Sequence, residues 1–390
     1  MTPLWLELTA LYVYGPLIVL FHELGHAVFA RRGGFRVTSF AVGLGRPLVR
    51  LGTIRGAVVW VGRWIFGGGF CVAIPISPAT RQRAWFYGGG LLVQLGLALV
   101  LWAGSDIWWV ARAATFNVLV FLTNAIPWRW GTSASDGWML LDLMRGARRQ
   151  SEILPQRAAL KKVAIRESVV ESPLGEAWAG LCLAWGDVVA GDTDAAGSFL
   201  ETPPAALRLE PYVHALSTYV TAEWHRRAHR PEDALATTTG FASPNASDAT
   251  QGFVALAHAG ALLDVGDRAE ACRVLGSLLS GPDFLVRQAL VLLLRATLEG
   301  PTEDIEHAAW RVLRHIDAAW LDPVRTATTL QEAANRLSCA NRATAATGIQ
   351  QAVQTLVART LSTAHSDHKS VLQDYFAGLS ASEASQPNAL

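Results

Sequence analysis

This 390-residue chain has few cysteines, and its first 150 residues have no lysine and few acidic residues. Each of these absences excludes some kinds of protein. The four cysteines (Cys71, Cys182, Cys272 and Cys339) lie far apart and form no Cys-x-x-Cys pair. This spacing argues against a cysteine-based zinc site and against a dense disulfide framework. Lysine is absent from residues 1–150, and only five acidic residues occur there, so long stretches carry no negative charge.

The two parts of the chain differ in charge, although the formal net charge of the whole is +1. Residues 1–150 contain fourteen arginines and five carboxylates, a net charge of +9, which leaves −8 for the remainder. Arginines beside membrane spans usually mark the cytoplasmic face. The basic excess therefore does not indicate a nucleic-acid partner, and we expect none. The contrast predicts a membrane domain over residues 1–149 and a soluble domain after it.

Three long apolar stretches predict transmembrane helices at residues 4–30, 84–103 and 107–127, each long enough for a bilayer core. The loop between the first two holds nine arginines and no acidic residue. The positive-inside rule then places the N-terminus outside and the C-terminal domain in the cytoplasm. We expect a multi-pass protein of the cell membrane, in contact with the lipid bilayer, whose apolar N-terminus is retained rather than cleaved.

The segment from residue 35 to residue 75 differs from the apolar stretches around it. It alternates β-prone residues with glycines, which predicts two to four short strands at the membrane face. An open strand edge there could hold an extended peptide by strand addition. A hairpin that only caps the membrane domain fits the same pattern.

His22-Glu23-Leu24-Gly25-His26 lies inside the first apolar stretch and is the most informative motif. On a helix, residues four apart share a face, so both imidazoles can reach one zinc ion. Glu23 is then placed to accept a proton from metal-bound water. Because ionisable residues are costly at membrane depth, this cluster predicts a hydrolytic zinc site within the bilayer.

A catalytic zinc ion usually has three protein ligands and a water molecule, so two histidines leave one ligand to find. Asp136 is the best candidate, because the chain breaks at Pro127, loops back and resumes a helix near the predicted cytoplasmic end of the third span. Asp142, on the following helix, is the competing carboxylate. We expect zinc to be held by His22, His26 and Asp136.

These elements in this order resemble the site-2 proteases, the zinc-dependent intramembrane metalloproteases. The resemblance covers roughly residues 10–145. Asn124, Pro127, Asp136 and Gly137 match the family's Asn-x-x-Pro…Asp-Gly pattern, and Phe66-Gly-Gly-Gly-Phe70 resembles its glycine-aromatic loop. Gly90-Leu-Leu-Val-Gln94 resembles a Gly-Pro-x-x-Asn element of the second span, with Gln in place of Asn.

The resemblance implies a metalloendopeptidase with Glu23 as catalytic base. It would cleave in or near the transmembrane segments of membrane-anchored proteins, in regulated proteolysis that releases a signalling protein. It also implies that Asn124, Gly68 and Gly69 bind the substrate. The alternative is a catalytically inactive relative that binds membrane proteins, or a scaffold that acts through its cytoplasmic helical domain.

Residues 150–361 predict a soluble helical domain with a weak internal repeat. Four turn-like motifs join pairs of helical stretches, and their final alanines (Ala196, Ala234, Ala271 and Ala308) lie 38, 37 and 37 residues apart. This period resembles tetratricopeptide helix pairs, which usually bind peptides or proteins, so we expect such a partner. An irregular helical domain is the alternative. Residues 362–390 predict a polar, flexible tail. The fold class is therefore mainly α, with a polytopic membrane domain, a small β region and a helical-repeat domain.

Overall fold

The computed structural model describes residues 4–54, 57–77, 82–130, 133–145, 172–241, 248–281, 283–316, 322–363 and 373. The chain divides into two compact units: residues 1–147 with 163–178 form the first, and residues 148–162 with 179–390 form the second. Helix α6, Pro173–Ala190, begins just before the last of these changes and is described with the second unit. The predicted boundary at residues 149 and 150 lies outside the described residues. The predicted tail lies outside them too, except for its first two residues, which end the last helix, and residue 373.

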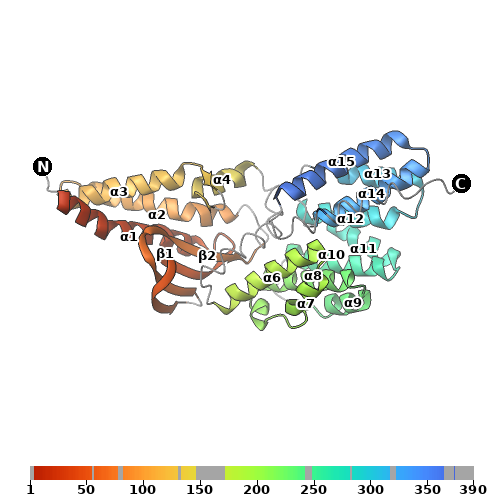
Figure 1. Ribbon diagram of the computed structural model, residues 1–390, viewed down its shortest axis with the longest axis horizontal. Coiled ribbons are helices and arrows are strands. Elements are labelled where there is room, and N and C mark those ends of the chain that lie inside the picture. The colour runs from red at the N-terminus through yellow and green to blue at the C-terminus, as the bar shows by residue number, and fades with distance from the viewer. Residues whose placement is uncertain are drawn as a thin grey trace. The chain divides into compact units, whose positions relative to one another are not determined.

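Three helices form the frame of the first unit (Figure 1): α1 Leu4–Phe29, α2 Arg83–Ala103 and α3 Trp108–Ala125. Each packs against the other two. Their bounds agree with the predicted apolar stretches to within two residues at every end. Of the helices described, α2 is the one that is long and apolar enough to cross a membrane by its length and composition.

The crossing of α1 and α2 depends on two glycines that face each other. A Cβ atom on Gly25 would collide with the carbonyl group of Gly89, and a Cβ on Gly89 would lie 2.6 Å from the carbonyl oxygen of Gly25. Small residues at such a contact permit two helix backbones to approach closely. This close approach brings the middle of α2 against the His-Glu-x-x-His turn of α1.

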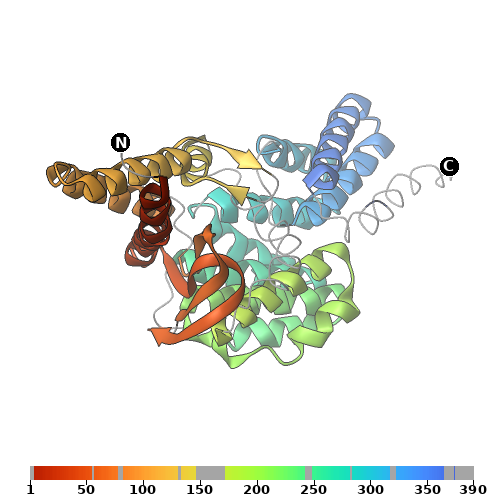
Figure 2. The same cartoon turned by 60° about the vertical axis from the view of Figure 1, so that its left-hand side comes forward.

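The β region predicted at residues 35–75 is confirmed, but the strands are two long ones, β1 Phe35–Ile54 and β2 Ala57–Pro75, and the predicted short length is wrong. The hairpin curls back on itself (Figure 2). Ser39 to Val42 pair on one side with Val72 to Gly69 and on the other side with Val58 to Val61. The 69–75 part of β2 pairs with β1 on one side, and β2 also packs against α1.

Helix α4, Asp136–Arg145, follows a small hairpin of β3 Arg129–Trp130 and β4 Ser133–Ala134. An apolar cluster of Phe35, Phe86 and Tyr87 is fully buried, and Met139 and Leu140 of α4 pack against it. Burial of large apolar side chains is the main stabilising term here. The cluster holds the start of α4 beside α2.

The second unit is a series of antiparallel helix pairs (Figure 1). The helices are α6 Pro173–Ala190, α7 Thr193–Leu200, α8 Pro211–Arg227, α9 Pro231–Thr239, α10 Asp248–Asp264, α11 Arg268–Leu278, α12 Asp283–Thr297, α13 Thr302–Leu313, α14 Pro323–Cys339 and α15 Ala343–Thr363. A short 3-10 helix, η3 Ala205–Leu209, precedes α8. The first three predicted turn motifs fall where the two helices of a pair meet, whereas the fourth lies in the first turns of α13.

The repeat continues into a fifth pair, α14 and α15, which the sequence motifs do not mark. One fully or almost fully buried alanine recurs in the second helix of each pair: Ala196, Ala234, Ala271, Ala309 and Ala346. The repeating residue of the fourth pair is thus Ala309, not the half-buried Ala308. A small buried residue at a fixed place in each pair lets the two helices pack closely. The tetratricopeptide assignment itself stays a prediction.

Buried ion pairs inside the helical unit join the second helix pair, α8 and α9, to the fifth helix pair, α14 and α15. Glu223 of α8 lies 2.5 Å from Arg226 and 2.5 Å from Arg325 of α14. Asp322, just before α14, lies 2.5 Å from Arg227 of α8. Opposite charges hold the pKa of Asp322 below its ordinary value although burial raises it. The network therefore joins two helices about 100 residues apart in the sequence.

Candidate metal centre

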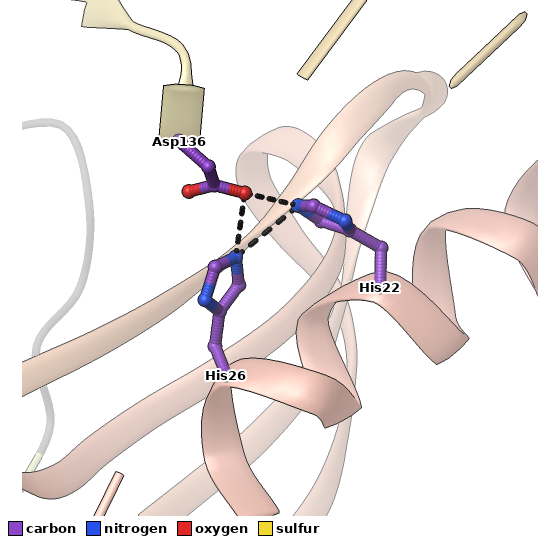
Figure 3. Close-up of side chains that lie close together, drawn as sticks. All are labelled: His22, His26 and Asp136. Carbon is purple, nitrogen blue, oxygen red and sulfur yellow. Dashed lines mark hydrogen bonds and ion pairs between the residues drawn. The ribbon is translucent and has the colours of Figure 1, made fainter. Parts of the chain in front are cut away.

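The two histidines of the motif point the same way from adjacent turns of α1, as the four-residue spacing requires (Figure 3). His22 Nε2 and His26 Nε2 lie 3.2 Å apart. Asp136 Oδ2, at the first residue of α4, lies 3.1 Å from His22 Nε2 and 3.2 Å from His26 Nε2. The structure thus brings together the three residues predicted as metal ligands, and both histidines are buried.

The outer nitrogen of each imidazole has a partner on α2 that determines its protonation. His26 Nδ1 lies 2.7 Å from the carbonyl oxygen of Phe86, which can only accept, so this nitrogen carries the hydrogen. His22 Nδ1 lies 2.9 Å from Gln94 Oε1, again an acceptor. When the imidazoles are neutral, both Nε2 atoms are then left with lone pairs that point inward, which is the arrangement of metal-binding histidines.

Three hydrogen-bond acceptors therefore meet with no proton between them. Asp136 Oδ2 is buried and has no hydrogen-bond partner among the described residues. Ligand atoms bonded about 2.0–2.1 Å from a tetrahedral zinc ion lie roughly 3.3 Å apart, close to the three spacings observed. Such a cluster is unfavourable without a cation, and His22, His26 and Asp136 could together hold one metal ion.

Ser135 fixes the backbone that presents Asp136. Its side-chain oxygen accepts a hydrogen bond from the backbone N–H of Trp138 at 3.1 Å, as an N-cap residue does. The same hydroxyl donates to the carbonyl oxygen of Ile126 at 2.7 Å. Gly137 follows, where a Cβ would overlap the carbonyl oxygen of Ala125. The cap and the glycine together place the first residue of α4 against the end of α3.

Helix α2 also limits the space above the histidines. A Cβ on Gly90 would lie 2.6 Å from His22 Cε1 and 2.7 Å from His26 Nε2, so no larger residue fits there without a shift. One turn further along, Gln94 is completely buried, and its backbone carbonyl accepts a hydrogen bond of 2.9 Å from Asn117 Nδ2 of α3. All three core helices thus contribute to holding His22.

Glu23, the predicted catalytic base, is buried next to the three ligand residues. Its side chain lies against Gly69 of β2, where an added Cβ would be 2.8 Å from Glu23 Cγ. The Glu23 carboxylate also accepts a hydrogen bond from the backbone of Cys71. The hairpin therefore positions the carboxylate that α1 supplies.

The structure shows where the other predicted site residues lie but does not test whether they bind substrate or metal. Asn124 is half-buried and donates through Nδ2 to the carbonyl oxygen of Val120 in its own helix, at 3.0 Å. Gly68 has φ +115°, a conformation that favours glycine, and open space where a side chain would be. Substrate binding by Asn124, Gly68 and Gly69 stays a prediction. Asp142 lies on α4 beyond Asp136, but its side chain lies outside the described set.

Three contributors to the site have no role assigned to them from the sequence. Gln94 is matched there only to an element of the second span, and the structure pairs it with His22. The carbonyl of Phe86 leaves no signal in a sequence, because any residue has one. Ser135 did leave a signal, since serine directly before an apolar helix is a common N-cap.

Comparisons with known proteins agree with this geometry. A family model described as peptidase family M50 matches residues 10–384, nearly the whole chain. No curated protein and no solved structure matches the chain. Because the matched region includes the buried His-Glu-x-x-His helix and extends through the helical unit, the chain belongs to peptidase family M50, the site-2 protease family of membrane metallopeptidases.

Proposed function

We propose that this protein is a zinc-dependent intramembrane endopeptidase that hydrolyses peptide bonds in or near the transmembrane segments of membrane-anchored proteins. The observation that carries the proposal is the convergence of two imidazole nitrogens and one carboxylate oxygen within 3.2 Å of one another. A carboxylate suited to proton transfer, Glu23, is buried beside them.

The residues of the chain divide the chemistry between them. Zinc bound by His22, His26 and Asp136 would lower the pKa of a bound water molecule and polarise the scissile carbonyl group. Glu23 accepts the proton of the attacking water and delivers it to the leaving amine. Gln94 and the Phe86 carbonyl hold the imidazoles in the orientation that leaves Nε2 free.

The side chains on the outside of the three-helix frame support three membrane crossings. Each helix exposes several large apolar side chains, among them Leu17, Leu24, Val28, Leu95, Leu99, Val100, Val118, Leu119 and Leu122. In water such surfaces would be costly, whereas lipid accommodates them. With the arginine-rich loop inside the cell, the metal site lies towards the cytoplasmic end of α1 and the helical unit is cytoplasmic.

An extended substrate segment fits beside Glu23. The 69–75 part of β2 pairs with β1 on one side, and Gly69 lies directly against the Glu23 side chain. Strand addition at this edge would expose the substrate carbonyls that a helix conceals. Asn124, Gly68 and Gly69 are the proposed contacts to the substrate backbone. Release of a membrane-anchored signalling protein is the proposed outcome.

The test compares wild-type protein with Glu23→Gln in detergent micelles, using zinc content and cleavage of a model transmembrane substrate. We expect both proteins to bind about one zinc ion, and only the wild type to cleave. A chelator should abolish wild-type cleavage, and added zinc should restore it. Equal cleavage by both proteins would refute the role of Glu23. Bound zinc with no cleavage by either would favour a binding protein without protease activity.

A further inference from the structure

The helical unit contains an open cavity of about 400 Å³, away from the buried ion pairs. Three segments line it: residues 203–208, one face of α8, and the end of α9 with Phe241. Its volume is within the ~300–1,000 Å³ range of ligand sites. No acidic side chain occurs among the described residues that line it.

One wall is a stripe of polar side chains on α8. His214, Ser217, Thr218 and Thr221 are spaced three and four residues apart, so they share one face of the helix. Ser217 and Thr218 are only 4% and 8% exposed, and both line the cavity. The hydroxyl of Thr237, on the opposite wall, donates to the Asp233 carbonyl oxygen at 2.8 Å.

Buried hydroxyl groups usually find partners, because leaving them unpaired costs free energy. Ser217 and Thr218 are largely buried, and both border the same cavity. An occupant with polar atoms would form hydrogen bonds with their hydroxyl groups. The other wall offers apolar surface from Pro203, Pro204 and Phe241, and the Phe241 ring lies 5.0 Å from the His214 ring.

The charge of the residues that line the cavity indicates the charge of its occupant. Arg208 lines the cavity, is exposed and has no ion-pair partner among the described residues. Burial, and then the positive charge of Arg208, lower the pKa of His214 below its ordinary value. Near neutral pH the cavity therefore carries one positive charge, which suits a singly charged carboxylate better than a phosphate dianion.

We propose that this cavity binds a short extended peptide through one carboxylate side chain, with Arg208 as its counter-ion and Ser217, Thr218 and Thr221 as hydrogen-bond partners. Hydroxyl groups both donate and accept, as peptide N–H and C=O groups require. Proline and phenylalanine supply contact area for a neighbouring apolar side chain. The inference names a surface and a partner chemistry for the helical unit, and it does not depend on the protease activity.

Full-length protein in detergent micelles, immobilised on beads, provides the test. The probes are two degenerate pools of end-blocked hexapeptides, one with glutamate fixed at the third position and one with glutamine there. Mass spectrometry measures how much of each pool is retained. We expect about tenfold more of the glutamate pool, because a charge-assisted hydrogen bond is lost with glutamine.

Variants assign that preference to the cavity. Arg208→Gln should abolish it, and Ser217→Ala and Thr218→Val should each lower retention of the glutamate pool several-fold. The matched controls are Arg314→Gln, an exposed arginine of the same unit, and Thr237→Val, whose hydroxyl is already paired. Both controls should retain the preference, as should Glu23→Gln.

Three results would overturn the proposal. The first is equal retention of the two pools by the wild type, and the second is a glutamate preference that survives Arg208→Gln. The third is stronger retention of a matched pool with phosphoserine at the fixed position, which would assign the cavity to phosphate. None of these measurements involves cleavage. Failure of the peptide-binding proposal is therefore distinguishable from failure of the proposed protease function.

Discussion

Gln94 Oε1 lies 2.9 Å from His22 Nδ1, and this contact joins the second core helix to the candidate metal centre on the first. Gln94 is itself completely buried and is held through its backbone carbonyl by Asn117 of the third helix. A hydrogen bond to the outer imidazole nitrogen fixes the tautomer and the orientation of a metal-binding histidine. Gln94 is thus a positioning residue for His22.

Gln94→Leu should lower the affinity for zinc by about 10- to 100-fold, because it removes the acceptor and leaves a buried N–H unpaired. Gln94→Glu retains an acceptor oxygen and should bind zinc with nearly wild-type affinity. The measurement is competition for zinc against a fluorescent chelator. An unchanged affinity in Gln94→Leu would contradict the positioning role.

Gly90→Ala should disrupt the metal centre for a steric reason. The new methyl group would lie 2.6–2.8 Å from atoms of His22 and His26, so one imidazole or the helix must shift. Gly88→Ala is the matched control, because it adds the same methyl group to the same helix in open space. Zinc content should fall in the first variant and stay near one per chain in the second. Full zinc content in Gly90→Ala would show that the site tolerates the added methyl group.

The two carboxylates of α4 can be separated by mutation. Asp136→Ala should lose bound zinc, since its Oδ2 lies within 3.2 Å of both imidazole nitrogens. Asp142→Ala should retain zinc and cleavage. Metal analysis of the two purified variants checks both expectations. The reverse pattern would transfer the ligand role to Asp142.

The buried ion pairs of the helical unit should make its free energy of unfolding depend on pH in the acid range. Opposite charges lower the pKa of Asp264 and Asp322 below the ordinary value of 3.8. The stabilisation that these carboxylates provide is therefore present above about pH 4 and is lost as the pH falls towards their lower folded pKa. The protection factors of α8 and α14 against hydrogen exchange, taken relative to the intrinsic exchange rate at each pH, should fall over that acid range in the wild type.

Asp322→Asn should weaken the same contact at neutral pH, because Arg227 would lose its buried counter-charge. Removing one partner of a buried ion pair costs about 3–5 kcal/mol, so hydrogen exchange in α14 should be much faster. The variant should also show a weaker acid dependence. Arg268→Gln, which removes an exposed ion pair with Glu299, is the control and should change little. Equal protection of α14 in Asp322→Asn and wild type would show that the pair is not stabilising.

In the helical unit, some turns leave a signal in the sequence and the contacts between distant helices do not. Turn motifs ending at Ala196, Ala234 and Ala271 predicted three of the intra-pair turns, because glycine, aspartate and proline leave local signals at helix ends. The turn of the fifth pair escaped because Asn341, which adopts φ 59°, has neither glycine nor proline beside it. The ion pairs between α8 and α14 also escaped, since nothing local indicates which distant helices will meet.

The sequence alone identified His22, His26 and Asp136 as the candidate metal ligands, because a four-residue spacing on a helix and an aspartate before a helix are local patterns. It also determined the extents of the three apolar helices. Only the tertiary structure decided which nitrogen of each histidine faces inward, that Gly90 leaves room for both rings, and that β2 places Gly69 against Glu23. Those features arise where residues 46 to 72 positions apart in the sequence pack together, and close packing selects partners that no local pattern encodes.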